Sequence, residues 1–362
     1  MRRLPIYFLI DVSESMIGTP IQEVQNGMRT IIQSLRVDPY ALETVFVSII
    51  AFAGKASVLS PLTELYKFYP PILPIGGGTS IGTALETLMK DIDKSVQKTT
   101  KDIKGDWKPI IFLFTDGNPT DNYSKAFKKW NEKYRPHCTL VAVSIGDNVN
   151  VLTLAQITDN ILLLKETDAE SFSKFFKWVT ASIQATSMSV SEQFSDDIKL
   201  PPHSGINLEK VDVEHAKQHP DEYANVDENF AVLHARCAHT KNDYLIKYAK
   251  RLEGYGPTPE FFGLEELRRQ YDNSYKLVGA YPIDKTAYKI LSGSKTAAIN
   301  SSSLIGLPAC PCCGNQIGAV VCNCGGIFCA EEGRPTVCPW CGAQGYLGEN
   351  DGSGFNINRG LG

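Results

Sequence analysis

The first 186 residues alternate short apolar runs with amphipathic helical patterns, and this alternation restricts the chain to few folds. Strands buried on both faces are predicted from the apolar runs at 4–10, 45–52, 110–114, 140–145 and 161–164. Between these runs, apolar residues recur every three or four positions, as on the buried stripe of a helix. We therefore predict an α/β fold with a doubly wound, mostly parallel sheet. Its ligand site should lie along the edge where the strands' carboxyl ends meet.

Length and composition indicate a folded, multidomain protein. The chain has 362 residues, of which 43% are hydrophobic and 21% charged, so intrinsic disorder is not indicated. The net charge of −4 gives no general attraction to nucleic acid or to an anionic membrane. The opening MRRLPIYFLI is read as a first strand rather than a signal peptide, because its apolar stretch ends at Asp11 without a cleavage site. We therefore expect a cytoplasmic protein with reduced thiols.

The pattern changes after residue 187. A polar stretch follows, and then short segments rich in Tyr, Val and Leu, such as FAVLHARCAH, DYLIKYA and KLVGAYPI, which predict a β-rich domain. One helix is expected at 260–271. The predicted divisions are a first domain at 1–187, a linker at 188–229, a C-terminal domain at 230–348 with a zinc ribbon at 308–345, and a flexible tail at 349–362.

Three segments predict a metal site on the first sheet's edge. Asp11, Ser13 and Ser15 form D-x-S-x-S after the first strand, Thr79 follows three glycines, and Asp116 follows a buried strand. D-x-S-x-S alone also suits an ordinary turn and helix cap. A carboxylate at the end of a buried strand, however, needs a partner or an ion. Two carboxylates and three hydroxyls are hard oxygen ligands, which suit Mg²⁺ or Mn²⁺ better than zinc.

An enzymatic use of this site is the alternative. A Mg²⁺-dependent hydrolase would need a nucleophile, a phosphate cradle or a second metal ion. The chain has no G-x-x-x-x-G-K-[ST] loop, and no histidine lies near the three segments in sequence. We therefore predict a binding module without catalytic residues, and not an enzyme.

Eight of the ten cysteines lie within a short C-terminal stretch, which points to metal rather than disulfides in a reducing compartment. Two C-x-x-C-G motifs supply Cys310, Cys313, Cys338 and Cys341. Each motif is typical of a tight zinc knuckle, and two knuckles give tetrahedral Zn²⁺ four thiolates. The segments AVVCNCG and GIFC between them are expected to pair as a hairpin. A thioredoxin-like redox role is the weaker alternative, because the required strand–helix context is absent.

The other four cysteines of the stretch are Cys312, Cys322, Cys324 and Cys329. They have the composition of a second four-thiolate zinc site, but reduced cysteines also pack well in a core. The prediction is one zinc ion, with the second site left open. Since so short a module buries little surface, zinc is expected to supply its folding energy.

The residues Asp11-x-Ser13-x-Ser15, Thr79 and Asp116 resemble the metal-ion-dependent adhesion site of von Willebrand factor A domains. The resemblance covers about residues 4–186. It implies that Ser13, Ser15 and Thr79 bind the ion directly and that the two aspartates act partly through water. It also implies that the open coordination position takes a carboxylate from a protein partner.

Over nearly the whole chain, the segments FTDGNPTD, RCAHTKNDYLIKYAKR and LPACPCCGNQIG resemble the TerY-type proteins associated with bacterial tellurite resistance. Those proteins accompany a protein kinase and a metal-dependent protein phosphatase. The resemblance therefore implies an adaptor that docks these enzymes in stress signalling. Cys312 is an extra cysteine relative to that pattern. A zinc-ribbon nucleic-acid binder is the other alternative, but Arg334 is the only basic residue of the 310–342 segment.

Overall fold

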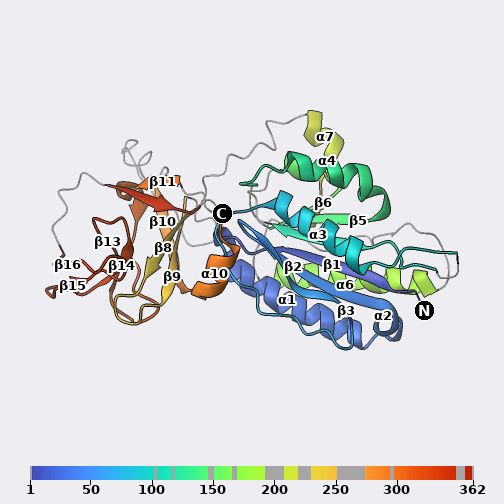
Figure 1. Cartoon of the computed structure of the whole chain (residues 1–362), viewed down its shortest axis with the longest axis horizontal. Helices are drawn as coiled ribbons and strands as arrows, with labels where there is room; N and C mark the ends of the chain where they lie inside the picture. The colour runs from blue at the N-terminus through green and yellow to red at the C-terminus, as the bar shows by residue number, and fades with distance from the viewer. Residues whose placement is uncertain are drawn as a thin grey trace.

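The protein has two lobes, one α/β and one mainly β (Figure 1). The computed structural model describes residues 2–101, 104–115, 119–145, 151–164, 169–191, 208–218, 230–250, 274–293, 297–347 and 355–360. In the first lobe, helices cover both faces of a sheet. Helix α10 of the second lobe lies where the two lobes meet.

The first lobe contains a seven-stranded sheet in the order β3-β2-β1-β4-β5-β6-β7. Its inner strands pair in parallel, and the edge strands β3 and β7 are antiparallel to their neighbours. The predicted doubly wound, mostly parallel sheet is therefore confirmed. The strands are β1 (Leu4–Asp11), β2 (Val45–Phe52), β3 (Ala56–Glu64), β4 (Ile110–Thr115), β5 (Thr139–Ile145), β6 (Asn160–Leu164) and β7 (Leu208–Lys210).

Side-chain alternation along β1 explains why the sheet is covered on both sides. Ile6 and Phe8 pack in one apolar core, whereas Tyr7 and Leu9 pack in the other. The first core is closed by α1 (Thr19–Arg36), α2 (Pro39–Thr44) and α6 (Ala169–Ser191). The second is closed by α3 (Ile81–Ser95), α4 (Ser124–Lys133), α5 (Val151–Leu154) and α7 (Val213–Gln218). Single 3₁₀ turns form at η1 (Glu14–Met16) and η2 (Arg135–His137).

The second lobe is built on a six-stranded sheet in the order β12-β10-β9-β8-β14-β13. Its strands are β8 (Phe230–Arg236), β9 (Asp243–Ala249), β10 (Tyr275–Pro282), β12 (Leu304–Ile305), β13 (Ile317–Val321) and β14 (Ile327–Ala330). The predicted hairpin of the cysteine-rich segment is confirmed, because β13 and β14 pair antiparallel. The remaining elements are α10 (Lys285–Leu291), η3 (Ser301–Ser303) and the pairs β11 (Ala297–Asn300) with β17 (Asn356–Arg359) and β15 (Thr336–Val337) with β16 (Gln344–Gly345).

Two segments that were predicted to be irregular, the linker and the tail, each contain a β-strand. Within the predicted linker 188–229, β7 covers the open edge of the first sheet by pairing with β6. Within the predicted tail 349–362, β17 pairs with β11 and buries Ile357 in the second lobe's core. Both pairings join segments far apart in sequence, so local composition did not reveal them. The helix expected at 260–271 lies outside the described residues.

No helix among the described residues is long and apolar enough to cross a membrane.

Candidate metal centres

The predicted adhesion-site loop begins where β1 ends. Asp11 is fully buried, and its Oδ1 accepts a hydrogen bond from the Ser13 backbone N at 2.9 Å. The hydroxyl oxygens of Ser13 and Ser15 lie 2.9 Å apart. The 3₁₀ turn η1 produces this geometry, because it folds Ser15 back beside Ser13. Three oxygen-bearing side chains therefore gather at the carboxyl end of β1.

Thr79 comes to the same edge on the glycine-rich loop. The Gly76 backbone N donates to Val12 O at 2.8 Å, which joins this loop to the β1 loop. Gly78 has a φ of +89°, a conformation that favours glycine. Thr79 is fully buried, and its hydroxyl has no hydrogen-bond partner in the described structure. Helix α3 begins two residues further on, at Ile81.

The third predicted segment reaches the site through Thr115, the last residue of β4. Its hydroxyl donates to Asp11 Oδ2 at 2.6 Å, so β4 and β1 end side by side. Asp116 itself lies outside the described residues. The described donors are carboxylate and hydroxyl oxygens, and a buried hydroxyl without a partner is costly unless something binds it. The site therefore fits a small hard cation.

The second lobe contains two compact groups of potential zinc ligands. In one, the ligand atoms of Cys322, Cys324, Cys338 and Cys341 lie within 4.8 Å of one another. Its sulfur pairs 322–341 and 324–338 are 3.7 and 3.8 Å apart. We name this group the turn cluster, because two of its cysteines lie in the β13–β14 turn.

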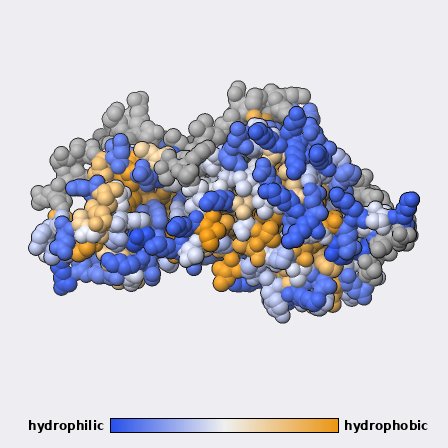
Figure 2. Space-filling view, viewed as in Figure 1, coloured by the Kyte–Doolittle hydropathy of each residue, from blue (hydrophilic) through white to orange (hydrophobic). Residues whose placement is uncertain are grey.

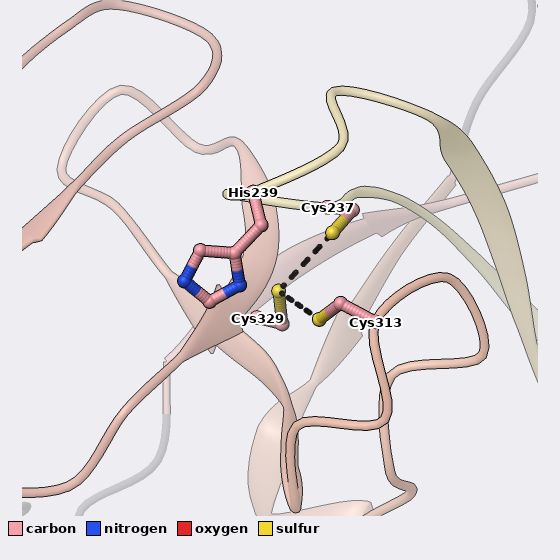
Figure 3. A group of neighbouring side chains, drawn as sticks. All are labelled: Cys237, His239, Cys313 and Cys329. Carbon is pink, nitrogen blue, oxygen red and sulfur yellow. Dashed lines mark hydrogen bonds between the residues drawn. The ribbon is translucent and has the colours of Figure 1, made fainter.

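The other group consists of Cys237, His239, Cys313 and Cys329, and we name it the hairpin cluster. The Cys329 sulfur lies 3.8 Å from the sulfur of Cys313 and 3.8 Å from that of Cys237 (Figure 3). A ring nitrogen of His239 points toward these sulfurs. Its Nε2 lies 3.3 Å from a carboxylate oxygen of Glu331. A carboxylate that orients a ligating histidine in this way is common around zinc.

The sulfur spacing in both groups matches tetrahedral zinc. Four sulfurs held about 2.3 Å from a tetrahedral ion are about 3.8 Å from one another. The observed separations of 3.7 to 3.8 Å are close to that value and far too long for disulfides. Both clusters therefore fit zinc without rearrangement of the cysteines.

The grouping of ligands predicted from spacing needs correction. Cys310, Cys313, Cys338 and Cys341 were expected to share one ion, but the two knuckles lie at opposite ends of the β13–β14 hairpin. Cys329 of the hairpin cluster is three residues beyond Gly326, which lies at the turn. A strand advances about 3.3 Å per residue, so Cys329 is about 10 Å along the strand from the turn. Each knuckle therefore joins hairpin cysteines instead of the other knuckle. This arrangement supports the second zinc site that the sequence left open.

Cys310 and Cys312 lie outside both groups of four. Cys310 is buried, and its thiol interacts with those of Cys313 and Cys329, so it is adjacent to the hairpin cluster. Cys312 packs against the second lobe's apolar core, and burial raises the pKa of its thiol to about 12. Cys312 is therefore suited to packing.

Sequence reasoning missed Cys237 and His239, although a knuckle surrounds them. Cys310 and Cys338 make the same two backbone hydrogen bonds. The backbone N of each cysteine donates to the carbonyl five positions on, and its carbonyl accepts from the backbone N four positions on. Cys237 repeats this pattern through Asn242 and Lys241. The position with positive φ, glycine in the other two turns, is Lys241 at +61° here. The C-x-x-C-G signature is therefore absent, and only the short Cys-x-His spacing could have identified this turn.

In each cluster, local hydrogen bonds favour the thiolate form of one cysteine. Burial raises the pKa of Cys237, but hydrogen bonds from Thr240 and from the His239 backbone outweigh it and lower the pKa to about 6. Hydrogen bonds from the Ala343 backbone and then from Cys324 lower the pKa of Cys341 to about 7. Since zinc binds thiolates, one ligand of each cluster is prepared for the metal.

A cavity of about 340 Å³ lies between the adhesion-site loop and the turn cluster. Both lobes line it, among others with Glu14, Gly77, Tyr288, Cys324 and Arg359. Apolar side chains gather on the surface near α10 and the start of α1, whereas the surface over α3 and α4 is largely hydrophilic (Figure 2). The adhesion-site loop is thus at the junction of the two lobes.

Each lobe is similar to a known protein domain. The family profile of the von Willebrand factor type A domain matches residues 6–178. The chain is also similar to the inter-alpha-trypsin inhibitor heavy chain H6 of Homo sapiens, with 22% identity over 159 residues. That match covers 42% of this chain and 12% of the relative's length.

Similar solved structures cover about half of the chain. The von Willebrand factor type A structure from Catenulispora acidiphila is 17% identical, covers 51% of this chain and 43% of that one, and has a TM-score of 0.38. Proximal thread matrix protein 1 from the mussel byssus, with a zinc-occupied MIDAS motif, is 18% identical, covers 51% and 46%, and has a TM-score of 0.37.

The family profile of the TerY-C metal binding domain matches residues 227–362. This range contains both cysteine clusters and the whole six-stranded sheet. The two matched domains follow one another along the chain, and the structure forms both. The chain therefore belongs to the TerY-type von Willebrand factor A proteins.

Proposed function

We propose that the protein is a metal-dependent adaptor that binds protein partners through the edge of its von Willebrand factor A domain. A Mg²⁺ or Mn²⁺ ion is held there by Asp11, Ser13, Ser15, Thr79 and Asp116, and the open position takes a partner's carboxylate. The observation that carries the proposal is the buried Thr79 hydroxyl, which lacks a hydrogen-bond partner in the described structure. A cation at this edge satisfies that oxygen together with the Ser13–Ser15 hydroxyl pair.

In this proposal the second lobe is a folded platform built on zinc. One ion is held by the turn cluster and one by the hairpin cluster, where either His239 or Cys310 completes the set with three thiolates. Zinc binding supplies folding energy that this loop-rich region lacks. A partner that reaches the cavity beside Glu14 would contact both lobes.

The proposed partners are a protein kinase and a metal-dependent protein phosphatase of a bacterial stress or tellurite-resistance system. The resemblance to TerY-type proteins supports this choice, and von Willebrand factor A domains generally mediate protein–protein interactions. The arginines beside the zinc clusters are engaged by carboxylates, Arg236 by Asp243 and Arg334 by Glu331. This pairing favours protein partners over nucleic acid.

The proposal is tested by calorimetric titration of Mg²⁺ into the metal-free full chain, followed by affinity capture from the native organism. Asp11→Asn should abolish Mg²⁺ binding, while Asp91→Asn, which changes a buried carboxylate on α3, should bind normally. Captured kinase and phosphatase should be lost in EDTA and with Asp11→Asn. Absence of Mg²⁺ binding to the wild-type chain, or capture that is insensitive to both changes, would refute the proposal.

A further inference from the structure

Strand β9 is buried along its whole length, and this burial has two separate sources. Tyr244, Ile246 and Tyr248 point into the second lobe's own core. Leu245 and Lys247 alternate with them and therefore face the other way. On that side Leu245 packs with Ile17, directly after the adhesion-site turn of the first lobe. The second lobe's sheet is thus docked on the loop that carries Ser13 and Ser15.

Lys247 makes the polar part of this contact. Its side chain is 4% exposed, and its Nζ donates hydrogen bonds to Ser15 O at 2.5 Å and Ile17 O at 3.3 Å. The ammonium also lies 4.4 Å from the centre of the Phe230 ring. These two carbonyls flank Met16, so a single side chain spans the end of the turn that sets the Ser15 hydroxyl. A buried ammonium must have acceptors, which makes this contact specific.

Other bonds across the junction hold the same loops. The Tyr288 hydroxyl donates to the carboxylate of Glu14, between the two serines. On the glycine-rich loop, the Gly77 backbone N donates to the Ser292 hydroxyl at 2.8 Å, and the Gly293 N donates to Gly77 O at 2.8 Å. Two of the three segments that form the adhesion site are therefore bonded to the second lobe.

The hairpin cluster lies at the other end of the same strands. Cys237 directly follows β8, and the turn that contains Cys237 and His239 leads into β9. Lys247 pairs with Val232 on β8, five residues before Cys237. A strand advances about 3.3 Å per residue, so about 16 Å of paired backbone joins the zinc ligands to the magnesium loop.

We propose that Lys247 is a positioning residue for the Mg²⁺-binding loop, and that through it zinc in the hairpin cluster strengthens Mg²⁺ binding. Zinc fixes the β8–β9 hairpin, the hairpin holds Lys247, and Lys247 holds the turn with the two serine ligands preorganised. The inference rests on the proposed function, because it requires both metals to bind. It adds that the two domains form one coupled device in which the affinities for the two metals depend on each other.

The first test compares Lys247→Met with Lys276→Met in the zinc-loaded full chain. Lys276 is also buried in the second lobe's sheet, but its Nζ donates to Lys250 O within that lobe. In Lys247→Met, calorimetry should show Mg²⁺ binding weakened about ten-fold, equivalent to about 1.4 kcal/mol. Hydrogen exchange of peptide 12–17 should rise in the presence of Mg²⁺, while metal analysis should show unchanged zinc. Lys276→Met should match the wild type in all three measurements.

The second test measures Mg²⁺ affinity before and after zinc is removed with a zinc-selective chelator. Zinc removal should weaken Mg²⁺ binding of the wild type, and it should weaken that of Lys247→Met by a smaller factor, because the link is already cut. Wild-type Mg²⁺ affinity in Lys247→Met with its zinc retained would overturn this inference and leave the proposed function intact. Equal losses in the two proteins on zinc removal would also overturn it. Absence of Mg²⁺ binding to the wild type would instead refute the proposed function.

Discussion

At the residue scale, the most informative group of the adhesion site is the Thr79 hydroxyl. It is buried and without a hydrogen-bond partner in the described structure, while the Thr79 backbone is fully engaged with Thr120. An unsatisfied buried hydroxyl costs about 1–3 kcal/mol, because water is lost and nothing replaces it. A cation bound as proposed would remove this cost. The hydroxyl therefore contributes nothing to the metal-free fold and becomes useful on metal binding.

Thr79→Val should consequently have opposite effects with and without metal. In EDTA the variant should be as stable as the wild type or more stable by about 1 kcal/mol, since the methyl group replaces an unsatisfied hydroxyl of similar size. With Mg²⁺, it should bind the ion at least about ten-fold more weakly, because one oxygen ligand is lost. Denaturant unfolding and calorimetry measure the two effects.

Thr120→Val is the matched control for this prediction. The Thr120 hydroxyl accepts from Thr79 N at 2.9 Å and donates to Thr79 O at 3.0 Å. Its loss should destabilise the chain by about 1–3 kcal/mol in both EDTA and Mg²⁺. A Thr79→Val variant that is destabilised in EDTA as much as Thr120→Val would show that its hydroxyl is structural.

Residue types alone predicted part of this site. Asp11, Ser13, Ser15 and Thr79 lie at one sheet edge as expected, because the carboxyl ends of parallel strands must meet there. Their binding of Mg²⁺ stays a prediction, as does the role of Asp116. Lys247 could not be found from sequence, because it meets Ser15 across 232 positions and no local pattern marks such a contact.

At the element scale, each cysteine knuckle needs a partner element to complete a zinc site. The knuckle at Cys338 joins the β13–β14 turn, and the knuckle at Cys310 leads to Cys313, which joins Cys329 and Cys237. The parallel pairing of β14 with β8 aligns Phe328 with Arg236, so the next residues of the two strands are Cys329 and Cys237. Strand register therefore determines which cysteines meet.

Metal content should follow this grouping. The wild-type chain is expected to hold two zinc ions, one for each cluster, and Cys324→Ser or Cys237→Ser should each reduce the content to one. A serine hydroxyl does not replace a thiolate at neutral pH. Cys312→Ser is the control and should retain both ions. Metal analysis of reduced protein is the measurement. A wild-type content of one zinc ion, unchanged in both Cys324→Ser and Cys237→Ser, would instead favour the ribbon predicted from spacing.

Elements that depend on local pattern were predictable, and elements that depend on remote pairing were not. The core strands of the first sheet and the β13–β14 hairpin follow from apolar runs and turn residues. Strands β7 and β17 are short and polar in composition, and only their pairing with β6 and β11 makes them strands. Cysteine spacing likewise indicated the two knuckles but not the cysteines that each knuckle joins. The length of the β13–β14 hairpin keeps the knuckles apart, and the spacing does not show this.

At the scale of the whole molecule, the two lobes have separate cores that meet at one junction. The first lobe's two cores are formed almost entirely by its own strands and helices, with Leu291 of α10 added at the junction. The second lobe has its own core around Tyr244 and Ile246, and a small apolar cluster containing Ile17 and Leu245 joins the two lobes. Loss of zinc should therefore loosen the second lobe and the junction without unfolding the first.

Tryptophan fluorescence can follow the two lobes separately. The chain has four tryptophans, and Trp340 is the one in the second lobe. It lies in the turn-cluster knuckle, where its Nε1 donates to Ile327 O at 2.8 Å and Arg236 stacks 3.9 Å from its ring. Trp130 and Trp178 are buried in the first lobe. The emission of Trp340 therefore reports on the second lobe, and the others report on the α/β lobe.

A zinc-selective chelator should accordingly shift the emission of Trp340 to longer wavelength and leave the other tryptophans unchanged. The reason is that Trp340 loses its packing when the thiolates of its knuckle are released, whereas the first lobe contains neither cysteine cluster. The measurement is the difference between the wild type and Trp340→Phe before and after chelation. Trp340→Phe alone should show almost no change. A red shift in Trp340→Phe as large as that of the wild type would mean that zinc holds the whole molecule together, and that the first lobe does not fold independently of the second.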